Sequence, residues 1–178
     1  WVQDMPMSKR CNACSPGYYQ TSQGQAMCLA CIPGRTGHTS EMSYQCDLCS
    51  LGRFMPDSNS NASECLPCNP GEYQDEKGQT SCVMCVPGFF NDMTNASVEC
   101  KACPRGWRQD KRNQTKCDVC EAGSYQSMEG QTNCKICQVG RFSDSLGSSV
   151  ECTQCPKGWV QHMRMEKRCN ACSPGYYQ

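Results

Sequence analysis

Apolar residues along this 178-residue chain do not follow the regular period of a helix. No window sustains a 3.6-residue repeat, because Gly, Pro, Ser and Asn interrupt every segment. What recurs is short: a glycine, an aromatic residue one or two positions later, and then a polar stretch. The pattern therefore predicts β-ribbons of two short strands, each too small to be stable alone.

Cysteines set the period of this pattern. All 20 lie in Cys-x-x-Cys pairs, and the first members of successive pairs are 17–19 residues apart. A glycine follows the second cysteine of every pair by three residues, and proline often precedes it, which suits a type II turn. Each unit is thus Cys-x-x-Cys, a tight turn, an aromatic and a polar loop, with Thr36 in place of the aromatic in one unit.

The sequence also repeats over distances longer than one unit. Three kinds of unit alternate, marked by Gly-x-Tyr-Gln, by Val-Glu before the next pair, or by Pro-x-Gly-Trp, so that one set spans about 52 residues. Residues 1–20 recur as residues 159–178 with 17 of 20 identical, a repeat of 158 residues. The chain therefore looks like a window from a longer array. We expect the end of a preceding unit at 1–10, three-unit sets at 11–64, 65–116 and 117–168, and the start of the next set at 169–178.

Composition indicates what stabilises such a chain. Cysteine makes up about 11 % of the residues, the level of a disulfide scaffold, whereas Leu, Ile, Val and Phe together number only 19. Burial alone cannot order a chain with so little aliphatic material, so cross-links or metal must do so. This excludes an ordinary globular enzyme fold. It predicts a small disulfide-rich, mostly irregular fold with short β-ribbons, arranged as a linear solenoid or rod.

The cysteine pairs have three possible roles. Their spacing is close to a four-thiolate zinc pattern, but zinc would group units in twos, whereas the sequence repeats in threes. A redox dithiol needs one activated thiolate, and ten near-equivalent pairs in turn-rich loops supply none. Structural disulfides are therefore favoured, and no cofactor or metal is expected.

One disulfide per unit fits any superperiod, with the second cysteine of a pair joined to the first of the next. Nested four-cysteine modules or a six-cysteine module remain possible, because spacing alone does not fix connectivity. Cys11 and Cys172 then have partners outside this window. The favoured pairs are Cys14–Cys28, Cys31–Cys46, Cys49–Cys65, Cys68–Cys82, Cys85–Cys100, Cys103–Cys117, Cys120–Cys134, Cys137–Cys152 and Cys155–Cys169.

The motif Cys-x-x-Cys-x-Pro-Gly-x-Tyr, followed by a Gly-containing loop and another Cys-x-x-Cys, resembles the ephrin-receptor-like cysteine-rich repeat, a relative of tumour necrosis factor receptor modules. The resemblance covers essentially the whole chain and implies the same single disulfide per unit. Such repeats occur in receptor ectodomains and in long surface proteins of protists and algae, including flagellar-hair (mastigoneme) components. The Trp-type units depart from the motif, because their aromatic follows the glycine directly.

Charge is balanced, with 17 basic and 17 acidic residues, which argues against nucleic acid as the main partner. No apolar run is long enough to span a bilayer, so we expect no membrane insertion in this segment. The Trp-type units are basic, and their charges either form a solvated surface or set the register between neighbouring chains. Trp107 and Trp159 are expected to pack locally, against a disulfide and an Arg stem, rather than to anchor an interface.

Three N-glycosylation sequons begin at Asn61, Asn95 and Asn113, each four or five residues before the next cysteine pair. Equivalent placement predicts exposed loops bearing N-linked glycans. The Ser-rich stretches 57–63 and 143–149 are weaker candidates for O-linked glycans. Residues 57–61 lack the spacing of a calcium loop, and the two histidines, His38 and His162, fall in non-equivalent units without a catalytic partner.

The sequence therefore predicts a structural, non-enzymatic protein located outside the cell or at its surface. It would be a stretch of a glycosylated, disulfide-stapled filament or surface appendage, with copies of itself or neighbouring repeats as partners. The alternative is a receptor-type ectodomain that binds a protein ligand. Near-identical recurrence after 158 residues counts against the alternative, because receptor arrays generally diverge from unit to unit.

Overall fold

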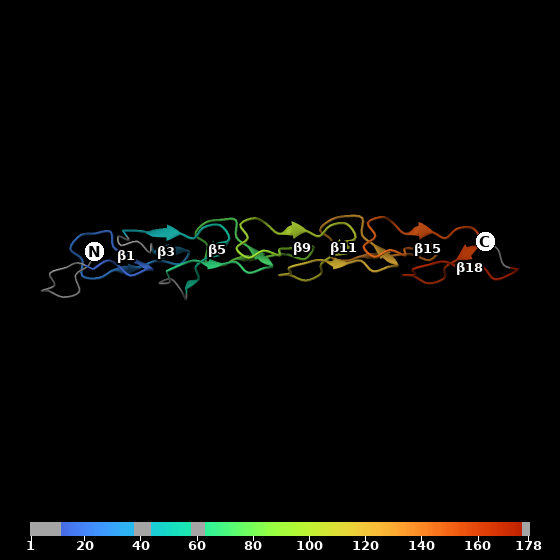
Figure 1. Cartoon of the computed structure of the whole chain (residues 1–178), viewed down its shortest axis with the longest axis horizontal. Helices are drawn as coiled ribbons and strands as arrows, with labels where there is room; N and C mark the ends of the chain where they lie inside the picture. The colour runs from blue at the N-terminus through green and yellow to red at the C-terminus, as the bar shows by residue number, and fades with distance from the viewer. Residues whose placement is uncertain (1–11, 38–43, 58–62, 176–178) are drawn as a thin grey trace. The chain divides into compact units, whose positions relative to one another are not determined.

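A computed structural model describes residues 12–37, 44–57 and 63–175, and these residues form short antiparallel hairpins without an α-helix (Figure 1). Eighteen strands pair as nine two-stranded sheets in these ranges. The hairpins are β1 (Tyr18–Tyr19) with β2 (Leu29–Ala30), β3 (Arg35–Gly37) with β4 (Cys46–Leu48), β5 (Arg53–Phe54) with β6 (Leu66–Pro67), β7 (Glu72–Tyr73) with β8 (Val83–Met84), β9 (Phe89–Phe90) with β10 (Lys101–Ala102), β11 (Trp107–Arg108) with β12 (Asp118–Val119), β13 (Ser124–Tyr125) with β14 (Lys135–Ile136), β15 (Arg141–Phe142) with β16 (Thr153–Gln154), and β17 (Trp159–Val160) with β18 (Asn170–Ala171).

One hairpin explains how each repeat folds. Gly88 lies in the turn before the first strand and has a φ of +89°, a conformation that this turn requires and that glycine adopts without steric cost. The turn is closed by the Phe89 N–H, which donates to the carbonyl of Val86 at 3.1 Å, so that Phe89 begins β9. Phe89 then pairs with Ala102 in the next Cys-x-x-Cys. The predicted β-ribbons and the disulfide-rich fold class are confirmed, and the second strand is the x-x of the following cysteine pair.

The buried interior consists mainly of sulfur. The second cysteine of each pair is the most consistently buried residue of the repeat, with 0 to 1 % exposed for Cys31, Cys68 and Cys120. The position three residues after the turn glycine is also buried, as at Met55 and Gln126. Most large apolar side chains remain exposed instead, which agrees with the shortage of aliphatic residues. Disulfides and a few polar side chains thus replace a conventional core.

The chain divides into two compact blocks, which are described separately. The N-terminal block comprises Trp1–Met84 and Met93–Glu99, and the C-terminal block comprises Cys85–Asp92 and Cys100–Gln178. Residues 93–99 belong to the first block because the Asn95 N–H donates to the carbonyl of Cys68 at 2.9 Å. The 52-residue sets expected from the sequence remain a prediction.

Backbone hydrogen bonds join consecutive repeats inside each block. In the C-terminal block the Gly106 N–H donates to the carbonyl of Gln126 at 2.8 Å, and the Gln109 N–H donates to Gln131 at 3.0 Å. In the other direction, the Gly130 N–H donates to the carbonyl of Cys103 at 2.8 Å. Some backbone N–H and C=O groups of each repeat therefore form their hydrogen bonds with the neighbouring repeat, and an isolated repeat would lack these bonds.

Within the C-terminal block, strands three repeats apart return to the same side. Figure 1 shows β9 and β15 at corresponding places along the upper edge of this block. These two strands are separated by three cysteine pairs in the sequence. Strands three repeats apart thus lie along the same edge of the block in this view, which matches the three kinds of unit in the sequence.

Candidate functional site

The disulfides are the most regular feature of the described residues. Each joins the second cysteine of a pair to the first cysteine of the next pair, with Cα–Cα distances of 5.6 to 5.8 Å and sequence separations of 14 to 16. Cys172 is half-buried and lies outside any disulfide in the described part of the chain, and Cys11 lies outside the described residues. The structure joins the same pairs that the sequence favours. They are Cys14–Cys28, Cys31–Cys46, Cys49–Cys65, Cys68–Cys82, Cys85–Cys100, Cys103–Cys117, Cys120–Cys134, Cys137–Cys152 and Cys155–Cys169.

A second turn in the polar loop places two of the sequon asparagines. Asn95 and Asn113 have φ values of +59° and +58°, in the left-handed region that asparagine tolerates better than most residues. Gly78 and Gly130 occupy the same position in other repeats, and Met165 does so with a φ of +65°. We call this position the loop turn. Nothing in the structure explains why a methionine occupies it in one repeat.

The loop turn is held by two contacts. Its N–H donates to the second cysteine of the preceding repeat, as the Asn113 N–H does to the Cys85 carbonyl at 2.9 Å. Its own carbonyl lies against a turn glycine two repeats earlier, so that a Cβ at Gly52 would overlap the backbone of Asn95. Glycine is thus needed at Gly52 both for its positive φ and for this close approach.

The side chains of Asn95 and Asn113 are exposed, as an acceptor of an N-linked glycan must be. Asn61 lies outside the described residues. Of the Ser-rich stretch 143–149, Ser143 is buried and unavailable for an O-linked glycan, because it occupies the buried position after the turn glycine. Residues 58–62 lie outside the described residues, whereas Asp57, at the start of the stretch without calcium-loop spacing, is exposed.

Sequence reasoning missed the role of the buried polar residue three positions after the turn glycine. Gln126 is 2 % exposed, its Nε2 donates to the Asn133 carbonyl at 2.7 Å, and its Oε1 accepts the N–H of Met128 at 3.2 Å. Gln74 and Gln109 make the equivalent pairs of bonds in their own loops. The Gly-x-Tyr-Gln motif contained this signal, because a glutamine at fixed spacing from a turn can span the loop that follows.

Arginine has a comparable role directly after the turn glycine. The Nη1 atoms of Arg35, Arg53 and Arg141 donate to the carbonyls of Cys46, Cys65 and Cys152 at 2.8 to 2.9 Å. These carbonyls belong to the cysteine at the start of the opposite strand. The guanidinium groups therefore help to close their hairpins.

The Trp-type repeats leave their charged and aromatic side chains at the surface. Trp107 is 39 % exposed and Trp159 is 44 % exposed, each at the start of its strand. Arg108 forms an ion pair with Asp110 at 3.7 Å. His162 is exposed, and His38 lies outside the described residues.

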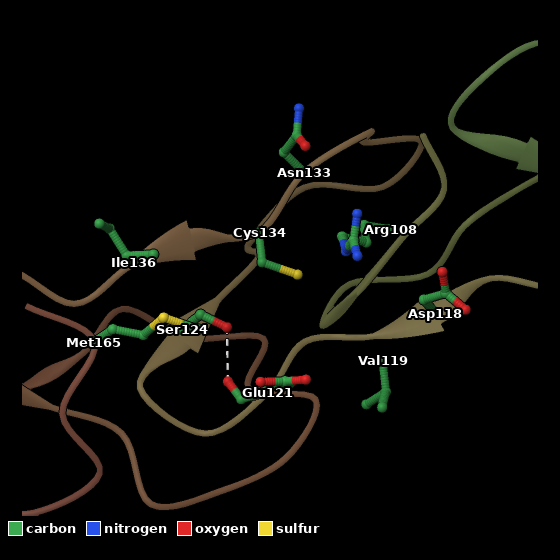
Figure 2. Close-up of a pocket in the computed structure, with 9 residues that line it drawn as sticks. All are labelled: Arg108, Asp118, Val119, Glu121, Ser124, Asn133, Cys134, Ile136 and Met165. Atoms are coloured by element: carbon green, nitrogen blue, oxygen red, sulfur yellow. Dashed lines mark hydrogen bonds between the residues drawn. The ribbon is translucent and has the colours of Figure 1, made fainter. Parts of the chain in front are cut away.

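A surface cavity of about 580 Å³ lies among the C-terminal repeats (Figure 2). The Ser124 hydroxyl, which lines it, donates to the Glu121 carbonyl at 2.6 Å, the bond drawn in Figure 2. Cys134, also in the lining, is oxidised in a disulfide. Neither group is therefore presented as an activated nucleophile. The full lining is Arg108, Asp118, Val119, Glu121, Ser124, Asn133, Cys134, Ile136 and Met165.

One tyrosine has a shifted pKa. Burial raises the pKa of Tyr73, and the nearby carboxylates of Glu99 and Asp75 raise it further, because each disfavours the phenolate. Among the described residues no cluster of three or more His, Cys, Asp or Glu could hold a metal ion, and no helix is long and apolar enough to cross a bilayer. The oxidised cysteines are not available as zinc ligands while the disulfides are intact.

These features define a class, the tandem cysteine-rich repeat array, with one disulfide and one hairpin per repeat. Residues 57–99 and 111–151 match the family model described as tyrosine-protein kinase ephrin type A/B receptor-like. The chain is also 35 % identical over 79 residues to the sushi, von Willebrand factor type A, EGF and pentraxin domain-containing protein 1 of Mus musculus. That match covers 42 % of this chain and 2 % of the mouse protein.

The resemblance to ephrin-receptor-like repeats is thus found in two long stretches of the chain. Repeats of this kind are typical of extracellular domains and are typically non-catalytic. Disulfides at this density agree with a secreted or extracellular location, where thiols are oxidised.

Proposed function

We propose that the chain is a structural segment of an extracellular filament or surface appendage, built from tandem disulfide-stapled repeats. The observation that carries the proposal is the covalent path through the array. Successive disulfides are separated by only the two residues of a Cys-x-x-Cys, and the loop of each repeat lies outside that path. Tension along the chain would therefore bypass the loops.

The size of this effect follows from chain dimensions. A fully extended repeat of 17–19 residues spans roughly 60 Å at about 3.4 Å per residue. With the disulfide intact, the shortest path is one Cys-x-x-Cys and one Cα–Cα distance of about 5.7 Å, which gives roughly 16 Å. An oxidised array can thus lengthen little under load, as a filament requires.

Pulling single molecules tests this mechanical role. Oxidised protein should show no extension step as long as a released loop, whose closing cysteines are 14 to 16 positions apart and which is roughly 50 Å long when extended. Reduced protein should gain that length for each broken bond. Loop-length steps in oxidised protein would contradict the proposed covalent path.

The assembly itself requires a separate experiment. The 158-residue recurrence supports a periodic assembly, because equal spacing gives equivalent contacts at equal intervals. Electron microscopy of the native material should show filaments, with copies of the chain or neighbouring repeats in contact. Isolated short particles at native concentration would refute the filament role and favour the receptor-type alternative.

We further propose N-linked glycans at Asn61, Asn95 and Asn113, which would keep the array soluble. Support comes from the exposed loop-turn position of Asn95 and Asn113. Mass spectrometry of secreted protein should find each site modified and each modification lost on substitution to glutamine. Unmodified peptides at all three sites would refute the proposed glycans and leave Asn95 and Asn113 with their place in the loop turn alone.

A further inference from the structure

Charge is separated between the two blocks although the whole chain is neutral. The C-terminal block carries twelve Lys and Arg against eight Asp and Glu, whereas the N-terminal block carries five against nine. The zero net charge therefore conceals a basic and an acidic part. A basic part of this kind can attract a polyanion that the chain as a whole would not.

Two groups of exposed basic side chains account for this excess. Both lie in Trp-type repeats, and in the described part of the chain none of their members has an ion pair. We call them basic cluster 1 and basic cluster 2. Cluster 1 comprises Arg105, Lys111, Arg112 and Lys116, and cluster 2 comprises Lys157, Arg164, Lys167 and Arg168.

The clusters occupy equivalent positions. When Cys103 is aligned with Cys155, three members of one cluster coincide with basic members of the other. The two repeats are three cysteine pairs apart, which is the interval at which β9 and β15 return to one side in Figure 1. An exposed tryptophan, Trp107 or Trp159, accompanies each cluster. The same combination of exposed positive charge and exposed tryptophan therefore recurs at an interval of three repeats.

We propose that this surface binds a linear sulfated polysaccharide. Arg and Lys bind anionic oxygens directly, and Arg does so with two parallel hydrogen bonds. A long polymer with regularly spaced sulfates matches two equivalent clusters better than a compact ligand does, and a sugar ring offers an apolar face to tryptophan. The choice of a polysaccharide over nucleic acid rests on the proposed extracellular location.

Cluster 2 is the better one to test. The sequon asparagine Asn113 is adjacent to Arg112 of cluster 1, so a glycan there would complicate the test, whereas Met165 takes that position beside cluster 2. The backbone around cluster 2 is held by the Met165 N–H, which donates to the Cys137 carbonyl at 3.0 Å, and not by the basic side chains. Substituting those side chains should leave the fold intact.

The experiment measures binding of the whole chain to heparin fragments at about physiological salt. The test variant combines Arg164→Gln, Lys167→Gln and Arg168→Gln. The control removes three exposed lysines elsewhere, Lys77→Gln, Lys101→Gln and Lys135→Gln. The test variant should bind roughly 3- to 100-fold more weakly than the natural chain, from three exposed charge contacts. The control should change little, and added salt should weaken binding in every case.

Three results would overturn the proposal. Equal losses in the test and control variants would show that only total charge matters. Equal affinity for a DNA strand of matched charge would assign the surface to polyanions in general. Self-association that the test variant abolishes, without heparin binding by the natural chain, would assign the clusters to the acidic block of a second copy. Each result is independent of whether the native material forms filaments.

Discussion

The contact between repeats two apart predicts different costs for one substitution at two equivalent glycines. Gly88 and Gly140 are the turn glycines of two different repeats, with φ values of +89° and +77°. Alanine at either position adopts a left-handed conformation at a cost of about 1–2 kcal/mol. At Gly140 a Cβ would have nothing within 4 Å, because the corresponding loop turn would fall beyond residue 178, so in a chain of this length no further cost arises there.

At Gly88 the added Cβ would overlap the carbonyl oxygen of Gly130 and lie 2.8 Å from its carbonyl carbon. The loop turn must then move away, and its hydrogen bond from the Gly130 N–H to the Cys103 carbonyl, now 2.8 Å, is lost. Breaking one buried hydrogen bond adds about 1–3 kcal/mol. Gly88→Ala should therefore cost roughly 2–5 kcal/mol in total.

Hydrogen exchange with the disulfides intact is the suitable assay, because an array of repeats need not unfold in two states. The Gly130 amide should exchange about tenfold faster or more in Gly88→Ala and at the natural rate in Gly140→Ala. Equal protection of this amide in both variants would refute the proposed packing between alternate repeats.

Three further predictions follow from other described features. Gln126→Ala leaves loop polar groups without their partner, so it should lower local stability by about 1–3 kcal/mol and speed exchange of the Met128 amide. Replacing Cys137 and Cys152 together by alanine removes a disulfide between cysteines 15 positions apart. This should lower the free energy of unfolding by about 3 kcal/mol and make the opened loop sensitive to protease. Because the pKa of Tyr73 is raised in the folded state, stability from this group is fully present below its ordinary value near 10. It is lost as pH rises through the higher folded value.

Controls separate these effects from general damage. Gln138 is exposed, so Gln138→Ala should not change exchange, and an equal effect of both glutamine variants would contradict the role of Gln126. Cleavage spread over the whole chain, instead of residues 138–151, would contradict local closure by the disulfide. In an absorbance titration Tyr73→Phe should remove a phenol that ionises above its ordinary pKa, and Glu99→Gln should shift the ionisation of Tyr73 to lower pH. If the pKa of Tyr73 is the same in Glu99→Gln as in the natural chain, Glu99 is not a cause of its elevation.

The hairpins were predictable because their signal is local. A turn glycine, the residues after it and the next cysteine pair recur together in the sequence, which predicts a hairpin for each repeat, whereas the pairing of Phe89 with Ala102 is known from the structure. The connection between repeats left no such signal. It uses backbone groups, such as the Gly130 N–H and the Cys103 carbonyl, which every residue type carries.

The candidate sites divide in the same way. Asn95 and Asn113 were visible as sequons, but their positive φ was not, because glycine, asparagine and methionine share the loop turn in different repeats. Gln126 was hidden for a different reason, since a glutamine has no hydropathy that marks it as buried. Its burial follows from the loop that it spans, where it bonds the Asn133 carbonyl and the Met128 N–H.

The loop turn also determines how easily a new attachment site for a sugar can arise. A residue with a hydroxyl already stands two positions after several loop-turn glycines, as Thr132 does after Gly130. A Cβ at Gly130 would meet its nearest neighbours at 3.6 and 3.7 Å, which is ordinary contact, and asparagine tolerates the backbone conformation. Gly130→Asn therefore completes a sequon at little structural cost. The decoration of such an array can thus change one repeat at a time over evolution, or by design, while the scaffold beneath it stays the same.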